Sequence, residues 1–430
     1  MTLPIFSRRL EKKRMRNSPF WLLIGGLMIV LDIYFFQIVK LLTSNAAPRT
    51  RSTIHLTYWI FSVLVIALLF LLPYLNLDNI RKGLRATVFS VLIAFFILKL
   101  FACIFFLIDD LRRGIQWLWG KIFFAGADTG TPQESPGIKR SVFLSWLGIA
   151  VGGSLFTSLL YGFTNKYNYN VKRIPVKFPN LPEAFRGMKV VQISDIHSGS
   201  LVNKEGVKKG VDMIMALKPD LILFTGDLVN NLAEEIEPLM DVFDKLKAPM
   251  GVYSVFGNHD YGDYVQWESP AKKAENIETL KGHHAKMGWK LLWDEHVALE
   301  KNGQQIALIG IQNYSALRNF ARYGNLAKAY EGTQSYPFKI LMTHDPTHWD
   351  AEVRPKFPDI DLTLSGHTHG FQFGVEIPGF RWSPVQYVYN QWAGLYKEGR
   401  QSIYVNRGFG FIGYPGRVGI LPEITLLEFA

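Results

Sequence analysis

The chain has only one cysteine, Cys103, in 430 residues. A single cysteine cannot form a disulfide within the chain, and it excludes any metal site built from several thiolates. The sequence also has no internal repeat and no low-complexity tract, which excludes a repeat architecture and a long disordered segment. With 48% hydrophobic residues, the chain has to be explained by packed domains, membrane segments or both.

Excess positive charge is also missing from more than half of the chain. Residues 164–430 hold 29 Lys and Arg and 29 Asp and Glu, whereas residues 1–163 hold 18 against 7. A nucleic-acid groove would place its excess on the domain that binds. The net charge of +11 therefore indicates membrane topology, and we expect no nucleic-acid partner.

Four apolar runs precede residue 165, and each has the length of about 20 residues that crosses a bilayer core. They are Phe20–Leu42, Ile54–Pro73, Ala86–Ile108 and Ser141–Phe163. All four are apolar on every face, so we expect residues 1–163 to form a four-helix transmembrane region in an inner or plasma membrane. Asp32 and Lys99 fall near the middle of the first and third runs, so a buried pair between them is geometrically possible; snorkelling of the charges and a purely structural pair are the alternatives to a functional role.

The basic residues that flank the runs predict the orientation of the chain. Those in the tail (8–16), in 81–85 and in 166–177 number thirteen, and those in the alternate loops number seven. This bias favours a cytoplasmic C-terminal domain. The Lys139-Arg140 pair before the fourth run resembles the start of a signal anchor, which leaves the opposite side open.

The remainder of the chain is predicted to be a linker over 164–187 and a globular domain over 188–430. Buried strands are expected at 188–194, 220–226, 251–257, 304–311, 338–344 and 361–366, with helices at 203–218 and 233–246. The pattern after residue 386 is mostly β. The domain is therefore of α/β class with a β-rich end.

Metal-ligating residue types recur directly after these predicted strands. In chain order the motifs are Asp195-Ile-His197, Gly226-Asp227, Gly257-Asn258-His259-Asp260, His344 and Gly366-His367-Thr-His369. In an extended D-x-H or H-x-H segment, alternate side chains face one side and converge on one ion. The preceding glycines permit sharp turns. Asp and His ligands suit borderline divalent ions such as Mn, Zn or Fe.

The ordered set of five motifs resembles that of the calcineurin-like metallophosphoesterases, in particular their membrane-associated bacterial branch. The resemblance covers residues 188–430 and implies a β-sandwich flanked by α-helices, in αββα layers. It implies two divalent metal ions and hydrolysis of a phosphoric ester or pyrophosphate, with the ions activating the attacking water.

The resemblance also implies roles for individual residues. Asp195, His197, Asp227 and His369 match the ligands of the first metal. Asp227, Asn258, His344 and His367 match those of the second, so that Asp227 bridges the two. His259 matches the histidine that steadies the phosphoryl group or protonates the leaving group, and Asp260 is expected to orient His259. Arg407 is a candidate phosphate contact.

The sequence narrows the substrate only to a class. Phosphatases of this superfamily that act on proteins carry Asp-Arg-Gly where this chain has Asp227-Leu-Val, which discounts phosphoprotein substrates. Resemblance and anchoring together favour a phosphodiester or pyrophosphate of a lipid-linked substrate, such as a UDP-diacylglucosamine-type lipid A precursor. Two alternatives stay open: a phosphodiesterase of envelope polymers or nucleotides that is merely anchored, and a membrane sensor that binds metal without catalysis. No obligate protein partner is evident.

Overall fold

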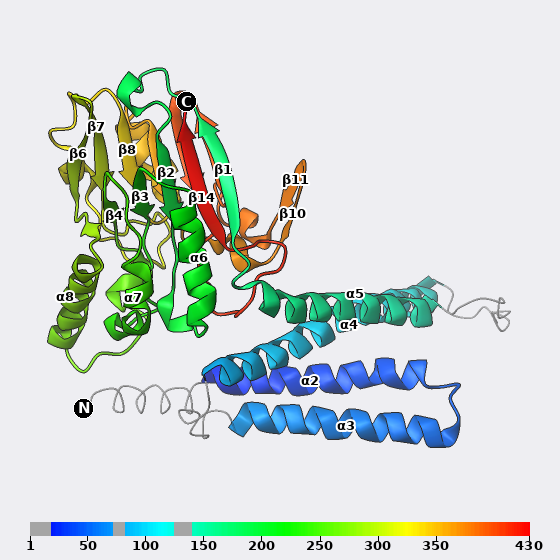
Figure 1. The fold of residues 1–430 in the computed structure, drawn as a ribbon. Coiled ribbons are helices and arrows are strands. Elements are labelled where there is room, and N and C mark those ends of the chain that lie inside the picture. Colours follow the sequence, from blue (N-terminus) through cyan, green and yellow to red (C-terminus); the bar gives the residue numbers. More distant parts are fainter. Residues whose placement is uncertain (1–18, 72–81, 124–139) are drawn as a thin grey trace. The chain divides into compact units, whose positions relative to one another are not determined.

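The computed structural model describes residues 19–71, 82–123 and 140–430 of the chain. It divides into two compact units, Met1–Leu160 and Tyr161–Ala430 (Figure 1). The basic tail at 8–16 and two of the residues used to predict orientation, Arg81 and Lys139, lie outside the described residues.

The first unit consists of four long helices, which confirms the predicted helical region. They are α2 (Pro19–Leu42), α3 (Pro48–Leu71), α4 (Lys82–Phe123) and α5 (Arg140–Gly162). All four are long and apolar enough to cross a membrane, with candidate spans at Leu23–Leu42, Pro48–Leu71, Ser90–Phe123 and Val142–Asn165. The helix α4 continues past residue 108, where Arg112 and Arg113 form ion pairs with Asp109 one turn away.

Small residues bring the backbones of α4 and α5 together. A Cβ atom on Gly152 would lie 2.7 Å from the Leu98 carbonyl oxygen, and one on Gly148 would lie 2.9 Å from that of Ala102. Gly148 and Gly152 are four residues apart and so share one face of α5. This spacing of small residues is typical of close helix contacts in membranes.

The pair between Asp32 and Lys99 that the sequence makes possible is present. The Lys99 ammonium donates to the Asp32 carboxylate, which also accepts hydrogen bonds from Ser62 and, at 2.9 Å, from the Tyr58 hydroxyl. Asp32, Ser62 and Lys99 are all buried. The pair thus joins α2, α3 and α4.

The second unit contains two six-stranded sheets. In spatial order the first is β1 (Asn170–Val176), β14 (Glu423–Phe429), β2 (Lys189–Ile193), β3 (Leu221–Phe224), β4 (Val252–Ser254) and β5 (Lys290–Leu291). The second is β12 (Gly394–Glu398), β13 (Gln401–Val405), β9 (Leu362–Ser365), β8 (Lys339–Met342), β7 (Gln304–Gly310) and β6 (Glu295–Lys301). A separate hairpin joins β10 (Val375–Ile377) to β11 (Phe380–Trp382).

Helices cover the outer faces, which confirms the predicted αββα layers. One apolar core lies between the sheets and includes Leu223, Leu308 and Leu364. A second core packs the first sheet against the helices α6 (Lys204–Ala216), α7 (Met240–Phe243) and α8 (Pro270–Lys286). The other sheet packs against the short helix α9 (Leu326–Tyr330) and against Trp349 and Val353, which directly precede the short helix α10 (Arg354–Lys356).

Two local predictions are wrong. Residues 164–187 are not a linker, because β1 pairs in parallel with β14 over seven residues. The helix expected over 233–246 is broken into two short 3₁₀ turns and α7. Pro238 lies in the second of these turns, and its lack of an N–H group disfavours a continuous helix there.

Candidate metal centre

The five motifs meet where strands of both sheets end. Asp195, Asp227 and Asn258 follow β2, β3 and β4 of the first sheet. His344 and His367 follow β8 and β9 of the second sheet. Side chains at the carboxyl ends of neighbouring strands lie at one edge, so the two sheets together supply one site.

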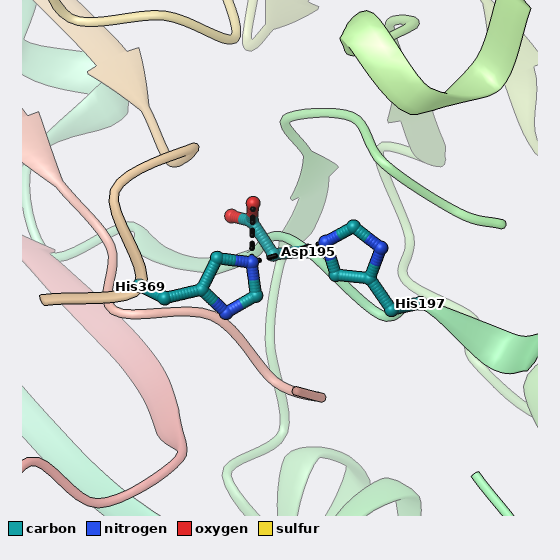
Figure 2. Close-up of side chains that lie close together, drawn as sticks. All are labelled: Asp195, His197 and His369. Carbon is teal, nitrogen blue, oxygen red and sulfur yellow. Dashed lines mark hydrogen bonds and ion pairs between the residues drawn. The ribbon is translucent and has the colours of Figure 1, made fainter. Parts of the chain in front are cut away.

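The first group of ligands comprises Asp195, His197 and His369, all buried (Figure 2). The Nε2 atom of His369 lies 3.2 Å from Oδ1 of Asp195 and 3.0 Å from Nε2 of His197. All three donor atoms fall within 4.8 Å of one another, which is the spacing that a single ion between them needs.

The second group comprises Asp227, His344 and His367. The Asp227 Oδ2 atom lies 3.1 Å from Nε2 of His344, and it is also 3.6 Å from Nε2 of His197 in the first group. Asp227 therefore lies between the two groups and can offer an oxygen to each.

The ligands converge by a different route from the one predicted. Neither D-x-H nor H-x-H is extended, because Asp195, His197, His367 and His369 all have positive φ, between 46° and 71°. Asp227 also has a positive φ, of 62°. Non-glycine residues rarely adopt this conformation, which costs about 1–3 kcal/mol each and clusters at functional sites.

The glycines before the motifs are required by close contacts, as predicted. A Cβ atom on Gly226, which has φ of 98°, would lie 2.5 Å from the backbone nitrogen of Gly257. A Cβ atom on Gly366 would lie 2.2 Å from Oδ2 of Asp195. Any larger residue at these positions would displace the ligand-bearing loops.

Most of the donor atoms are already in the protonation state that a metal needs. Burial lowers the pKa of His197, His367 and His369, which keeps these rings neutral. Burial raises the pKa of the Asp195 carboxyl, but the neighbouring His369 outweighs it and holds that pKa below its usual range. Only His344 differs: burial lowers its pKa, yet Asp227 and Asp195 raise it to about 10.

Asn258 provides an independent test of whether the site fits a metal. Its Nδ2 atom donates a 2.8 Å hydrogen bond to the Tyr264 hydroxyl, which identifies Oδ1 as the atom left over. This Oδ1 atom is buried and has no hydrogen-bond partner among the described residues. An unsatisfied buried oxygen beside carboxylates and neutral imidazoles fits a hard or borderline cation.

His259 lines the same cavity and is oriented by the backbone. Its Nδ1 atom lies 2.8 Å from the Asn230 carbonyl oxygen, so Nδ1 carries the proton and Nε2 is left for the cavity.

The expectation that Asp260 orients His259 is wrong. The buried Asp260 carboxylate instead accepts hydrogen bonds of 2.8–3.2 Å from the backbone N–H groups of Asp227, Leu228, Val229 and Gly257. Asp260 clamps two ligand-bearing loops together and has no exposed atom to offer a substrate.

The expectation that Arg407 contacts phosphate is also wrong. Its side chain is buried and forms ion pairs with Glu423 at 2.5 Å and Glu376 at 2.8 Å. Both acceptors also have a second partner within the protein, since Glu423 accepts from Tyr404 and Glu376 pairs with Lys172.

Arg417 was missed by sequence reasoning. It is fully buried, and its guanidinium donates to the carbonyl oxygens of His369 at 3.1 Å and Arg407 at 2.7 Å. It also lies 3.4 Å from Nδ1 of His369. Arg417 is 48 residues away from His369 in the chain, and no spacing pattern links the two.

The cavity at this site has both a polar and an apolar lining. It has a volume of about 300 Å³. His197, Asp227, Asn258 and His367 contribute polar lining, and the apolar lining comes from Phe320, Phe371, Val385, Val388 and Ile412, which we call the apolar wall. Such a cavity suits a substrate that carries a phosphoryl group next to an apolar group.

Comparisons with known proteins agree with this geometry. Residues 188–371 match the family model "Calcineurin-like phosphoesterase", and residues 15–166 match the model "Probable Calcineurin-like phosphoesterase, transmembrane domain". The chain is 28% identical over 419 residues to a "Transmembrane protein with metallophosphoesterase domain" of Danio rerio, covering 94% of this chain and 88% of the relative. It is 29% identical over 299 residues to the "Uncharacterized metallophosphoesterase YkuE" of Bacillus subtilis, and the match covers 67% of this chain and 96% of the relative.

Proposed function

We propose that this chain, a membrane-embedded calcineurin-like metallophosphoesterase and hence a metal-dependent phosphoester hydrolase, cleaves a phosphodiester or pyrophosphate bond in a lipid-linked substrate. The observation that carries the proposal is the cavity, which is lined both by the candidate metal-ligating side chains and by the residues of the apolar wall. The four candidate spans support it, because they keep the site close to amphiphilic molecules.

We propose that seven residues hold two divalent ions, drawn from Mn, Zn and Fe. Asp195, His197 and His369 would hold one, and Asn258, His344 and His367 the other, with Asp227 shared. When bound, such a pair supplies an activated water and neutralises charge on the phosphoryl oxygens. The chain itself fixes the positions of the ligands through the hydrogen bonds of Asp260 to the loops that bear them. The residues of the apolar wall limit the access of water to the cavity.

His259 is proposed to hold the proton that the leaving group takes. Its Nδ1 is fixed on the Asn230 carbonyl, so its Nε2 is the atom that faces a substrate in the cavity. Diesters and pyrophosphates can have poor leaving groups, whose departure needs a proton from a general acid. Such acid catalysis raises the rate about 10²–10⁴-fold.

A pair of chromogenic diesters tests the substrate class. The full chain, purified in detergent with Mn²⁺, is assayed on hexadecyl p-nitrophenyl phosphate and on methyl p-nitrophenyl phosphate. The apolar wall predicts a kcat/KM at least about tenfold higher for the long-chain ester, since burial of several methylenes is worth more than 1.4 kcal/mol. Equal kcat/KM values for the two esters would contradict a lipid-linked substrate. Binding of two metal ions without hydrolysis of either ester would favour the alternative of a membrane sensor that binds metal without catalysis.

In its sharpest form, the proposal is that UDP-diacylglucosamine is the substrate. It also places the second unit (Tyr161–Ala430), which we call the catalytic unit, in the cytoplasm. Release of UMP from that compound by the purified chain, absent in Asp227→Ala, is the expected result. A reporter fused after Ala430 checks the side of the membrane. A reporter signal from outside the cytoplasm would remove nucleotide-linked precursors and move the proposal to envelope lipids.

A further inference from the structure

The β10–β11 hairpin exposes apolar side chains and turns its charged side chains towards the protein. Its cross-strand pairs are Val375 with Trp382, Glu376 with Arg381, and Ile377 with Phe380. Val375, Ile377 and Phe380 are exposed, with Ile377 at 58% and Phe380 at 53%. Strand side chains alternate between faces, so a hairpin on a water-soluble surface is expected to turn its charged pair outwards. Here the apolar residues take that place.

The charged residues of the hairpin turn towards the protein. Glu376 accepts an ion pair from Arg407 at 2.8 Å and one from Lys172 at 3.2 Å. Arg381 donates to the Ala393 carbonyl oxygen and, at 3.2 Å, to the Tyr396 hydroxyl. Because these bonds hold the charged face of the hairpin against the protein, the opposite, apolar face is exposed.

Further exposed apolar side chains adjoin the hairpin. Tyr387 is 76% exposed, and its hydroxyl accepts from the Trp382 indole at 3.4 Å. Val388 follows Tyr387 and lines the cavity, as does Phe371, and both are exposed. We call Val375, Ile377, Phe380, Tyr387, Val388 and Phe371 the apolar lip; it connects the tip of the hairpin to the mouth of the metal-site cavity.

The root of the hairpin touches the end of a membrane span. Residues 161–165 end the fourth candidate span but belong to the catalytic unit. The Gly162 carbonyl oxygen accepts from the Arg417 backbone at 2.9 Å, and a Cβ atom on Gly162 would lie 2.6 Å from Cγ2 of Val418. Val418 in turn accepts from the backbone of Gly374, directly before β10, at 2.9 Å. One residue thus joins the hairpin to the point where the chain leaves the span.

We propose that the apolar lip docks on the lipid bilayer, with Ile377 and Phe380 inserted at the boundary of headgroups and acyl chains. A bilayer is the partner that the contacts favour, because the root of the hairpin is joined through Val418 to the residues that end a candidate span, and the lip presents aliphatic and aromatic side chains. Docking would place the mouth of the cavity at the bilayer surface, where an amphiphile can enter without crossing water. The docking itself does not depend on the proposed reaction.

A depth measurement tests the docking directly. In a Cys103→Ala background, Ile377→Cys is labelled with bimane, and the full chain is reconstituted in phosphatidylglycerol and phosphatidylethanolamine vesicles. Ala298→Cys, an exposed position on the edge strand β6, serves as the matched control. Lipids with a doxyl group near the headgroup are expected to quench the Ile377 label at least about threefold more than the control. Quenching of both labels by aqueous iodide alone, or protection of Ile377 from both quenchers, as a protein partner would give, overturns the proposal.

An activity measurement distinguishes docking from damage to the site. The double variant Ile377→Ser/Phe380→Ser is expected to lose about tenfold in turnover of vesicle-borne hexadecyl p-nitrophenyl phosphate and to keep its turnover of methyl p-nitrophenyl phosphate. The control is Leu395→Ser, an exposed apolar residue on β12 outside the lip. Equal loss on both esters, or loss on neither, overturns the proposal. If the chain hydrolyses no diester, the quenching experiment still decides the docking.

Discussion

Both units of the molecule bury charged side chains, but they neutralise the charge in different ways. In the membrane unit, Asp32 has a lysine partner in Lys99 and further hydrogen bonds from Ser62 and Tyr58. In the catalytic unit, Asp195 and Asp227 are equally buried, and the ion pairs recorded for them in the described part of the chain are with histidines alone.

The difference separates a structural charge from a functional one. A buried carboxylate is costly unless it is paired, and Asp32 finds its partner within the protein. Asp195 and Asp227 together face one charged ring, His344, and the neutral rings of His197 and His369, so that one negative charge is left for an external cation to balance. The candidate site of the catalytic unit thus leaves a charge that a bound cation can balance, whereas Asp32 is balanced within the membrane unit.

Asp227→Ala should have the largest effect, because Asp227 lies between both ligand groups. We expect hydrolysis of hexadecyl p-nitrophenyl phosphate to fall on the order of a thousandfold, since several kcal/mol of charge stabilisation is lost. Metal content measured by plasma mass spectrometry should fall with it, while the circular dichroism spectrum is retained. Asp241→Ala, on the exposed surface of α7, is the control and should match the parent chain. Retained activity in Asp227→Ala would mean that the two groups do not act as one centre.

Lys99→Met should destabilise the membrane unit (Met1–Leu160), in which Lys99 balances the buried charge of Asp32. It leaves Asp32 buried without its cation, which costs about 3–5 kcal/mol of unfolding free energy. The double variant Asp32→Leu/Lys99→Met removes both charges and should recover most of that loss. Denaturation of the detergent-solubilised chain measures both effects. Metal content and kcat should stay at parental values in the folded fraction of each variant, and a selective fall in kcat would show that the pair has more than a structural role.

The comparison also explains which features the sequence predicts. The two groups of candidate ligands that the structure brings together could be predicted because scarce residue types, His and Asp, recur directly after apolar strand runs, and the order of residues along the chain shows this pattern. The roles of Asp260, Arg407 and Arg417 could not be found, since each depends on partners brought together by the tertiary fold. The strand β1 was taken for a linker for the same reason: it is stabilised by β14, some 250 residues later.

Asp345→Asn should have an intermediate effect through His367. The Oδ2 atom of Asp345 lies 3.4 Å from Nε2 of His367, and the Tyr389 hydroxyl lies 2.9 Å from the same nitrogen. With Nδ1 towards the metal, Nε2 carries the proton and faces this pair, which fixes the orientation of the ring. We expect metal affinity and kcat/KM to fall about 10–100-fold, as is usual for such supporting carboxylates. Asp350→Asn is the control, because the half-buried Asp350 pairs with Arg354 rather than with a candidate ligand; an equal loss there, or none at Asp345, would contradict the role.

The smallest effect concerns one proton. Because the two carboxylates outweigh burial and raise the pKa of His344 to about 10, this ring is charged at neutral pH in the metal-free chain. Its ion pairs stabilise the metal-free fold fully below about pH 6.5, the ordinary value, and that stabilisation is lost as pH rises through about 10. A metal requires the neutral ring, so Mn²⁺ affinity should rise about tenfold per pH unit between pH 7 and 9.

Calorimetric titration in two buffers of different ionisation enthalpy counts the protons released. Close to one is expected at pH 7.5, because burial already keeps His197, His367 and His369 neutral and the carboxylates are already ionised. Release of none would mean that the carboxylates do not hold the proton on His344, and release of several would mean that the other rings are charged as well. Release of several protons would mean that the catalytic unit balances its buried charge internally, as the membrane unit does, and the contrast between the two would be lost. Release of none would leave both carboxylates unbalanced and would sharpen the contrast.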